Sequence, residues 1–254
     1  MTPRAGESIF RSMARRVRNV VIPAPVIFGR VACLGQSLYY MRSKELGRSQ
    51  FLNQQKVRCD LFLDRLLGAP RPIASEVVEH LARDHVAPCI WEQEALPWVG
   101  TRRPPRLLLM DSFAELTDQK FVHRRDKWSF ACHYRDLVHS EKFSADFECL
   151  GLLDPEQFER VYYDFFAWFF GKFPRSRIVF FHFPTKLDPR HQFRERAAVL
   201  RRVVEGFASS NSSILSVAVD DGLVEPSIET PHRYHFSRET NLAMVRVWQE
   251  LERR

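Results

Sequence analysis

Two short segments near opposite ends of the chain hold the residues best suited to nucleophilic chemistry. Gly35, Gln36 and Ser37 follow an apolar run, and a loop near the C-terminus holds His232 and His235. A serine becomes a nucleophile when a histidine takes its proton and N–H groups stabilise the oxyanion that forms. We therefore expect Ser37 and His235 to form a catalytic pair. Gly35, Gln36 and His232 are expected to contact the substrate.

The elements that would position these residues can be read from the apolar pattern. Short apolar runs rich in β-branched residues predict buried strands at 26–34, 106–110, 176–181 and 214–219. Helices are predicted at 38–66, 76–82, 154–170, 193–207 and 237–251. Buried strands that alternate with helices indicate an α/β fold, a three-layer sandwich with a mostly parallel sheet.

Polar residues follow several of these predicted strands directly. In parallel sheets, ligands bind outside the carboxyl ends of the strands. Ser37, Asp111, His182 and Asp220 each stand just past a predicted strand, and His235 lies on the loop before the last helix. Their convergence on one edge of the sheet predicts the functional site.

We place Asp111 in the catalytic group of this site. The residue after it, Ser112, and the residue after the third predicted strand, His182, are expected to contact the substrate.

Both ends of the chain and most of its C-terminal half resemble the SGNH (GDSL-like) hydrolase and acyltransferase superfamily. The GQS segment at 35–37 is similar to the serine turn of carbohydrate-directed acetylesterases, and HFSRETNLAMVRVWQEL at 235–251 resembles the family's closing histidine block. The strand–helix–strand run at 177–219 adds to this similarity. The resemblance implies a flavodoxin-like sheet, with Ser37 as nucleophile and His235 as base.

The chain departs from the family's pattern at two places. His232 stands three residues before His235, where the family has an aspartate, so Glu229, Asp220 or a backbone carbonyl would have to orient the histidine. Asp111 stands where the family keeps its oxyanion-hole asparagine. Since an ionised carboxylate would repel an oxyanion, we expect Asp111 to be protonated, to point away or to have another role.

The resemblance implies a serine esterase or O-acyltransferase that acts on a carbohydrate ester. The segment LLLMDSFAELTDQKF is similar to proteins found with bacterial surface-polysaccharide genes, which favours a role in polysaccharide modification. An esterase would need no cofactor, whereas a transferase would need an acyl donor such as acetyl-CoA.

Two alternative functions stay open. One is a non-catalytic glycan-binding or assembly protein of the same fold. The other is a sugar transferase that uses Asp111 or His182 as its base and holds a phosphorylated donor with basic residues.

The positive charge of the chain is concentrated near its start. Residues 1–58 contain eleven lysine and arginine residues against two acids, a net charge of +9, whereas the whole chain of 254 residues has +7. We expect a basic arm at 1–25, with possible peripheral membrane contact, before a single domain at 26–254 in which 113–150 would be an insertion. No base-stacking aromatic residues interleave with the basic ones, so nucleic acid is not an expected partner.

The cysteines and the hydropathy pattern indicate a cytoplasmic protein. Five scattered cysteines without a C-x-x-C pair argue against a disulfide framework and a zinc ribbon, and predict reduced core thiols. No apolar run reaches the roughly 20 residues needed to span a bilayer. No metal site is expected, because His232 and His235 lack a third ligand at a defined spacing.

Overall fold

The computed structural model describes residues 25–47, 49–67, 74–95, 101, 103–229 and 233–254. Nearly all of the expected basic arm and the expected substrate residue His232 lie outside these ranges. Within them, no helix is both long and apolar enough to cross a membrane.

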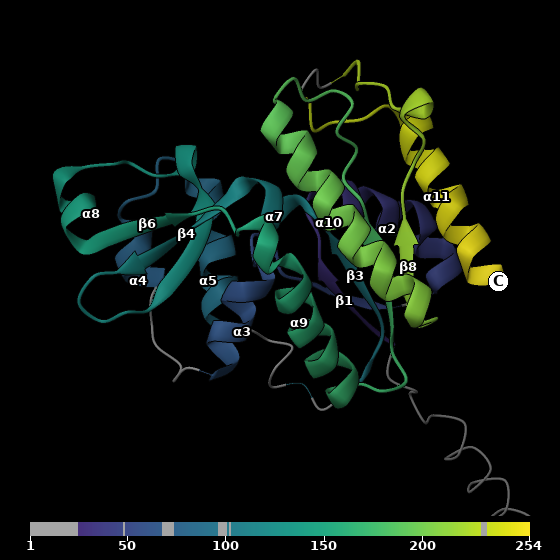
Figure 1. The fold of residues 1–254 in the computed structure, drawn as a ribbon, viewed down its shortest axis with the longest axis horizontal. Helices are drawn as coiled ribbons and strands as arrows, with labels where there is room; N and C mark the ends of the chain where they lie inside the picture. Colours follow the sequence, from purple (N-terminus) through teal and green to yellow (C-terminus); the bar gives the residue numbers. More distant parts are fainter. Residues whose placement is uncertain (1–24, 48, 68–73, 96–100, 102, 230–232) are drawn as a thin grey trace, which may run out of the picture.

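A five-stranded parallel sheet forms the centre of the molecule (Figure 1). Its strands are β1 (Val26–Arg30), β2 (Gln50–Asn53), β3 (Pro105–Asp111), β7 (Arg177–Phe181) and β8 (Ile214–Val217). They pair in the order β2-β1-β3-β7-β8, and every pairing is parallel. This is the strand order of flavodoxin-like doubly wound sheets. It confirms the predicted α/β fold with a mostly parallel sheet.

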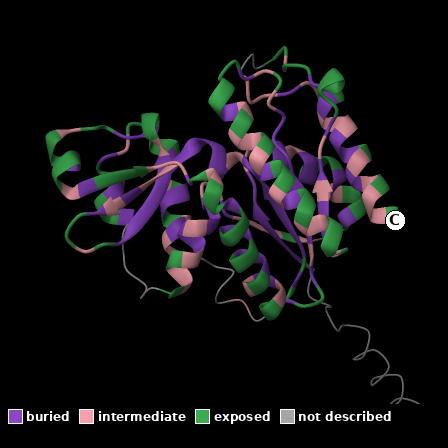
Figure 2. Ribbon diagram, viewed as in Figure 1, coloured by how far each residue is buried: buried purple, intermediate pink, exposed green. Residues whose placement is uncertain are grey.

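Helices cover both faces of this sheet. The helices α2 (Cys33–Leu46) and α11 (Arg238–Arg253) pack on one face, and α3 (Cys59–Leu67), α9 (Phe158–Lys172) and α10 (His191–Ser210) pack on the other. Successive strand residues point to opposite faces, so Leu109 packs toward α2 and α11, whereas Leu108 and Met110 pack toward α9. The strands β1, β3, β7 and β8 are therefore mostly buried (Figure 2), and this explains their apolar runs, whereas the edge strand β2 has no fully buried residue.

The aromatic helix α9 forms much of the core, as its sequence predicted. Phe158, Tyr162, Phe165 and Phe169 have no exposed surface. Before the helix, the carboxylate of Asp154 accepts a hydrogen bond from the N–H of Glu156 at 3.0 Å, so it caps the 3-10 turn η3 (Pro155–Gln157). The helices predicted at 193–207 and 237–251 are confirmed as α10 and α11.

Residues 74–95 and 118–151 form a lobe beside the main sheet, at the left of Figure 1. Three antiparallel strands make its sheet: β4 (Asp118–His123), β5 (Ser129–His133) and β6 (Phe147–Gly151). The short helices of this region are α4 (Ala74–Val78), η1 (Asp84–Val86), α5 (Ala87–Ala95), η2 (Tyr134–Asp136) and α8 (Glu141–Asp146). Phe121, Phe130 and Phe147 belong to a core of its own. The helix α7 (Phe113–Thr117) connects β3 to this lobe.

The segment 26–38 differs from the prediction. The strand predicted at 26–34 ends at Arg30, and the predicted turn at 35–37 lies inside α2. Val31, Leu34 and Leu38 are buried together at helical spacing, so the apolar run contains the end of a strand and the first turn of a helix. Gly35 serves packing rather than a turn, because a Cβ there would lie 2.5 Å from Val31.

The helix predicted at 38–66 is also wrong. It is interrupted by the short edge strand β2, and its last part is the separate helix α3.

The side chain of Arg30 joins the central strands to the surrounding helices. It is buried at the end of β1, and its Nη1 donates to Glu115 Oε1 at 2.7 Å and to the carbonyl of Val57 at 2.8 Å. Its Nη2 donates to the carbonyl of Asp111 at 3.2 Å and to the hydroxyl of Tyr162 at 3.3 Å. One guanidinium group thus fixes the ends of β1 and β3 against α7 and α9.

Replacing Arg30 tests how much its guanidinium group contributes to the stability of the fold. We expect Arg30→Met to lower the free energy of unfolding by about 3–5 kcal/mol, because Glu115 would be left buried without its cation. The double variant Arg30→Met/Glu115→Met should recover most of this loss. Urea denaturation monitored by circular dichroism measures both values.

The control is Arg125→Met, which removes a surface ion pair with Asp126. It should change the free energy of unfolding by less than about 1 kcal/mol. An equally small effect of Arg30→Met would contradict a structural role for the buried pair.

Candidate active site

A pocket of about 250 Å³ opens where β1 and β3 end. In a sheet with this strand order, β1 and β3 flank the point at which the order reverses, and ligands bind in the crevice there. The main domain contributes Arg30, Val31, Ala32, Cys33, Gln54, Gln55, Lys56, Asp111, Phe113 and Ala114, and the lobe contributes His85, Cys89 and Asp118. We call this the Asp111 pocket.

Asp111 is the buried acid of this pocket. Its Oδ2 accepts a hydrogen bond from the N–H of Ala32 at 2.7 Å, and its Oδ1 accepts one from the N–H of Phe113 at 3.0 Å. Burial raises the pKa of Asp111 to about 7, although the two N–H groups and the charge of Arg30 oppose the shift. The carboxyl group therefore exchanges a proton near neutral pH, and protonation is one of the three alternatives that the sequence left open for Asp111.

Cys33 is a pocket residue that the sequence analysis missed. It was expected among the core thiols, but the structure places it at the first residue of α2, exposed and lining the pocket. Although part of Cys33 is exposed, partial desolvation of its thiol by the pocket walls and the nearby charge of Asp111 raise the pKa of Cys33, while the backbone N–H groups of Cys33 and Leu34 lower it. The thiol is therefore protonated at neutral pH.

The other cysteines divide between core and surface. Cys59, Cys89 and Cys132 are buried, as predicted, whereas Cys149 is exposed.

An ion-pair network closes the lobe side of the pocket. The Nζ of Lys56 lies 3.3 Å from Asp118 Oδ1 and 3.0 Å from Asp136 Oδ2. Burial alone would lower the pKa of Lys56, but the two carboxylates raise it well above its usual value. Lys56 also has a φ of 56°, in the left-handed region that non-glycine residues rarely adopt. Its ammonium group fixes the loop after β2 against the lobe.

The expected nucleophile Ser37 lies in a helix and not in the turn that the sequence predicted. It is half-buried in the second turn of α2, on the same helix face as Cys33 and one turn farther along. The residues between β1 and α2 are Val31 and Ala32. The described residues that line the Asp111 pocket include Cys33 but neither Gln36 nor Ser37.

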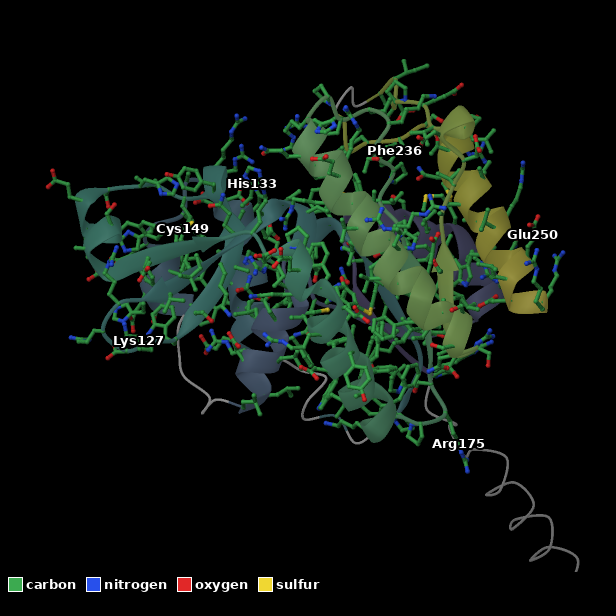
Figure 3. All side chains as sticks on the ribbon, in the orientation of Figure 1. Lys127, His133, Cys149, Arg175, Phe236 and Glu250 are labelled. Carbon is green, nitrogen blue, oxygen red and sulfur yellow. The ribbon has the colours of Figure 1, made fainter. Side chains whose placement is uncertain are left out.

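The expected base His235 lies on the loop before α11. Its backbone carbonyl accepts a hydrogen bond from the N–H of Ser227 at 2.9 Å, and its side chain is half-buried. The ring of the preceding residue, Tyr234, contacts that of Phe113 in the Asp111 pocket, with 5.0 Å between centroids. Phe236, which follows His235 in the chain, lies at the opposite end of the main domain from Arg175 (Figure 3). Glu229, one of the candidates to orient His235, is exposed on the same loop.

Ser112 and His182 line a second hollow rather than the Asp111 pocket. Ser112 Oγ accepts a hydrogen bond from the N–H of Phe183 at 3.2 Å, and His182 Nε2 lies 2.8 Å from Ser216 Oγ. Burial lowers the pKa of His182 to about 3, so its ring is neutral. The structure thus places both residues at the expected sheet edge but separates them from the pocket of Asp111.

Asp220, the last of the expected polar residues, has a role in turn formation. Its carboxylate accepts a hydrogen bond from the N–H of Gly222 at 2.7 Å, at the start of the 3-10 turn η4 (Asp221–Leu223). Across the described ranges, no group of three or more His, Cys, Asp or Glu residues is arranged to hold a metal ion.

Comparison with known proteins found similarity to solved structures, but no match to a family model or a curated sequence. A protein assigned as an acylhydrolase from Bacteroides fragilis is 10% identical, with 93% of each chain covered and a TM-score of 0.47. The family 3 carbohydrate esterase of Clostridium thermocellum is 10% identical, with 89% of this chain and 94% of that chain covered and a TM-score of 0.39. An acetyl xylan esterase from Butyrivibrio proteoclasticus is 8% identical, with 92% of this chain and 63% of that chain covered and a TM-score of 0.40.

The raised pKa of Asp111 predicts a pH-dependent cost to stability. In the unfolded chain an aspartate has a pKa of about 4. Between pH 4 and 7 the folded protein therefore binds the proton more tightly, and the contribution of Asp111 to the free energy of unfolding falls as the pH rises. Relative to Asp111→Asn, the wild type should lose about 3 kcal/mol over this range, because each unit of pKa difference corresponds to about 1.4 kcal/mol.

Urea denaturation of both proteins at several pH values measures this difference. The exposed Glu159→Gln variant is the control, and its curve should run parallel to that of the wild type. Parallel curves for the wild type and Asp111→Asn would show that the folded protein does not raise the pKa of Asp111.

Proposed function

We propose that the chain is an esterase or O-acyltransferase that acts on a carbohydrate ester in the Asp111 pocket. The observation that carries this proposal is a buried carboxyl group with a pKa of about 7 at the β1/β3 edge, where such sheets bind ligands. A group with this pKa can both accept and return a proton at neutral pH. Ester cleavage and acyl transfer require both steps.

The reaction follows from the position of Asp111. Its carboxylate takes a proton from a water molecule or a sugar hydroxyl while that oxygen attacks the ester carbonyl carbon. The bond from this carbon to the alcohol oxygen then breaks, and Asp111 returns the proton to the leaving oxygen. With water the products are a carboxylic acid and an alcohol. With a sugar hydroxyl the product is a new ester.

The start of α2 offers stabilisation for the negative charge on the carbonyl oxygen. The backbone N–H groups of Cys33 and Leu34 are close enough to the thiol of Cys33 to lower its pKa. This thiol lines the pocket. Both groups belong to the first turn of α2, where helix N–H groups lack acceptors within the helix. Such donors stabilise developing oxyanions.

The pocket wall contains two buried polar side chains. Gln54 and Asp118 are fully buried in this wall. Gln54 Oε1 and Asp118 Oδ2 have no hydrogen-bond partner among the described residues. Neither oxygen is accessible to a ligand in this structure, so the substrate class does not rest on them. The resemblance of the sequence to carbohydrate acetylesterases favours a carbohydrate substrate.

A non-catalytic glycan-binding protein is the second candidate function. Arg30 occupies the end of β1 and is held by four hydrogen bonds. The residues that follow it before α2, Val31 and Ala32, carry no nucleophile. This local structure differs from the serine turn that the sequence resemblance implies, and a protein that kept only binding would tolerate such a change.

Turnover of p-nitrophenyl acetate and of an acetylated monosaccharide tests the proposal. We expect Asp111→Asn to lower kcat by at least about 100-fold, the usual effect of losing a general acid–base. Ser37→Ala should retain wild-type activity, because Ser37 lies outside the lining of the Asp111 pocket.

The remaining outcomes assign the function differently. Loss of turnover in Ser37→Ala and His235→Ala, with activity kept in Asp111→Asn, would establish the serine mechanism that the sequence predicted. Sugar binding by the wild type without any turnover would establish the non-catalytic function. Circular dichroism of each variant controls for misfolding.

The pH dependence of catalysis gives an independent prediction. Asp111 acts as a base in its ionised form, so kcat/KM should rise with pH through an apparent pKa of about 7 and then level off. The residual activity of Asp111→Asn should lack this inflection. Initial rates between pH 5 and 9 with an ester whose leaving group does not titrate there provide the measurement. The same inflection in both proteins would exclude Asp111 as the base.

A further inference from the structure

A hollow of about 130 Å³ lies against α10, beyond the ends of β7 and β8. Its lining residues are Ser112, His182, Phe183, Pro184, Thr185, Arg194, Ala197, Ala198, Arg201, Ala218, Val219 and Asp221. None of them lines the Asp111 pocket, so this His182 hollow is a separate candidate site. It lies at the carboxyl edge of the sheet, where doubly wound folds bind ligands.

Two arginines on one face of α10 flank the hollow. Arg194 and Arg201 are seven residues apart, which places them on the same side of the helix and about 10 Å apart along its axis. The residues between them on this face are Ala197 and Ala198, and Ala218 contributes a third small side chain. The small side chains leave space for a ligand between the two guanidinium groups.

Both arginines keep donors for a ligand. Arg194 donates from Nη1 to the backbone carbonyl of Asp188 at 2.6 Å, and among the described residues no carboxylate forms an ion pair with it. Arg201 donates from Nε to Glu205 at 2.7 Å, so its two terminal nitrogens are not used by that pair. A guanidinium group has five N–H donors, and two such groups can bind an anion from both sides.

The remaining lining of the hollow mixes apolar residues with a few polar ones and includes no further lysine or arginine. The ring of His182 forms part of it, neutral and bonded to Ser216. Thr185 adds a hydroxyl group, and Asp221 adds an exposed carboxylate. Asp221 would accept a hydrogen bond from a ligand hydroxyl, whereas it would repel a second anionic group. The lining therefore suits a ligand that combines one anionic group with hydroxyl groups.

We propose that the His182 hollow binds the phosphate group of a phosphorylated hydroxy compound, such as a sugar phosphate, between Arg194 and Arg201. A phosphate group has enough oxygens to engage both guanidinium groups at once, and its size matches a hollow of this volume. The hydroxyl groups of the ligand then face Asp221. This site is independent of the acyl chemistry proposed for Asp111, and either assignment can fail alone.

Isothermal titration calorimetry at constant ionic strength tests the site with inorganic phosphate and with glucose 6-phosphate. We expect both to bind the wild type, with glucose 6-phosphate binding more tightly. Arg194→Gln and Arg201→Gln should each raise Kd for glucose 6-phosphate at least tenfold, and the double variant should abolish binding. Arg202→Gln is the matched control, because Arg202 is exposed on the same helix and outside the hollow. Its Kd should equal that of the wild type.

Asp221→Asn distinguishes the ester from free phosphate. It should tighten inorganic phosphate binding by removing a negative charge, and weaken glucose 6-phosphate relative to phosphate by removing a hydroxyl acceptor. Equal wild-type affinity for the two ligands would overturn the ester assignment. No binding of either ligand, or the same loss in Arg202→Gln as in Arg194→Gln, would overturn the site.

Discussion

The buried ion pair between Arg30 and Glu115 is the constraint on which the arrangement of this molecule depends. Moving two charges out of water costs several kcal/mol per ion, and only good geometry and further hydrogen bonds offset that cost. Here Glu115 Oε1 also accepts a hydrogen bond from the N–H of Cys59 at 3.0 Å, so the pair connects the start of α3 as well as both central strands. Arg30 Nε and Glu115 Oε2 remain buried without partners among the described residues. Removal of either partner alone would therefore leave an uncompensated charge in the core.

Arg30 also explains how Asp111 is oriented. The guanidinium group binds the backbone carbonyl of Asp111, whereas the carboxylate of Asp111 accepts from Ala32 and Phe113. The cation thus fixes the main chain without neutralising the acid. Burial acts in opposite directions on acids and bases, since it penalises the charged form of each. The same sheet edge therefore holds an acid that is partly protonated near neutral pH and, in His182, a base that stays neutral.

The sequence predicted the parts of the fold whose patterns are long and unambiguous. The helices α9, α10 and α11 have extended periodicity, and β3 and β7 are short apolar runs between clear breaks. The boundary near residue 30 could not be placed, because apolar residues at 31, 34 and 38 fit a strand and a helix equally well. The strand β2 has only four residues at the edge of the sheet, with no apolar signal beyond Phe51 and Leu52.

Residues of the candidate site could be predicted only where the neighbouring strand or helix was predicted correctly. Asp111 could be predicted because it directly follows a well-defined strand. Cys33 could not, since its position depends on the misplaced boundary. His85 and Asp118 reach the pocket from the lobe, and only tertiary structure shows that contact.

The lobe has a consequence for how this protein can change over evolutionary time. Its aromatic core is separate from the two cores that hold the main sheet, yet His85, Cys89 and Asp118 form one wall of the Asp111 pocket. Asp111 and these three wall residues therefore belong to parts of the chain with separate hydrophobic clusters. In descendants of such a chain, substitutions or insertions in the lobe would reshape this wall of the pocket while the cores that position Asp111 are inherited unchanged.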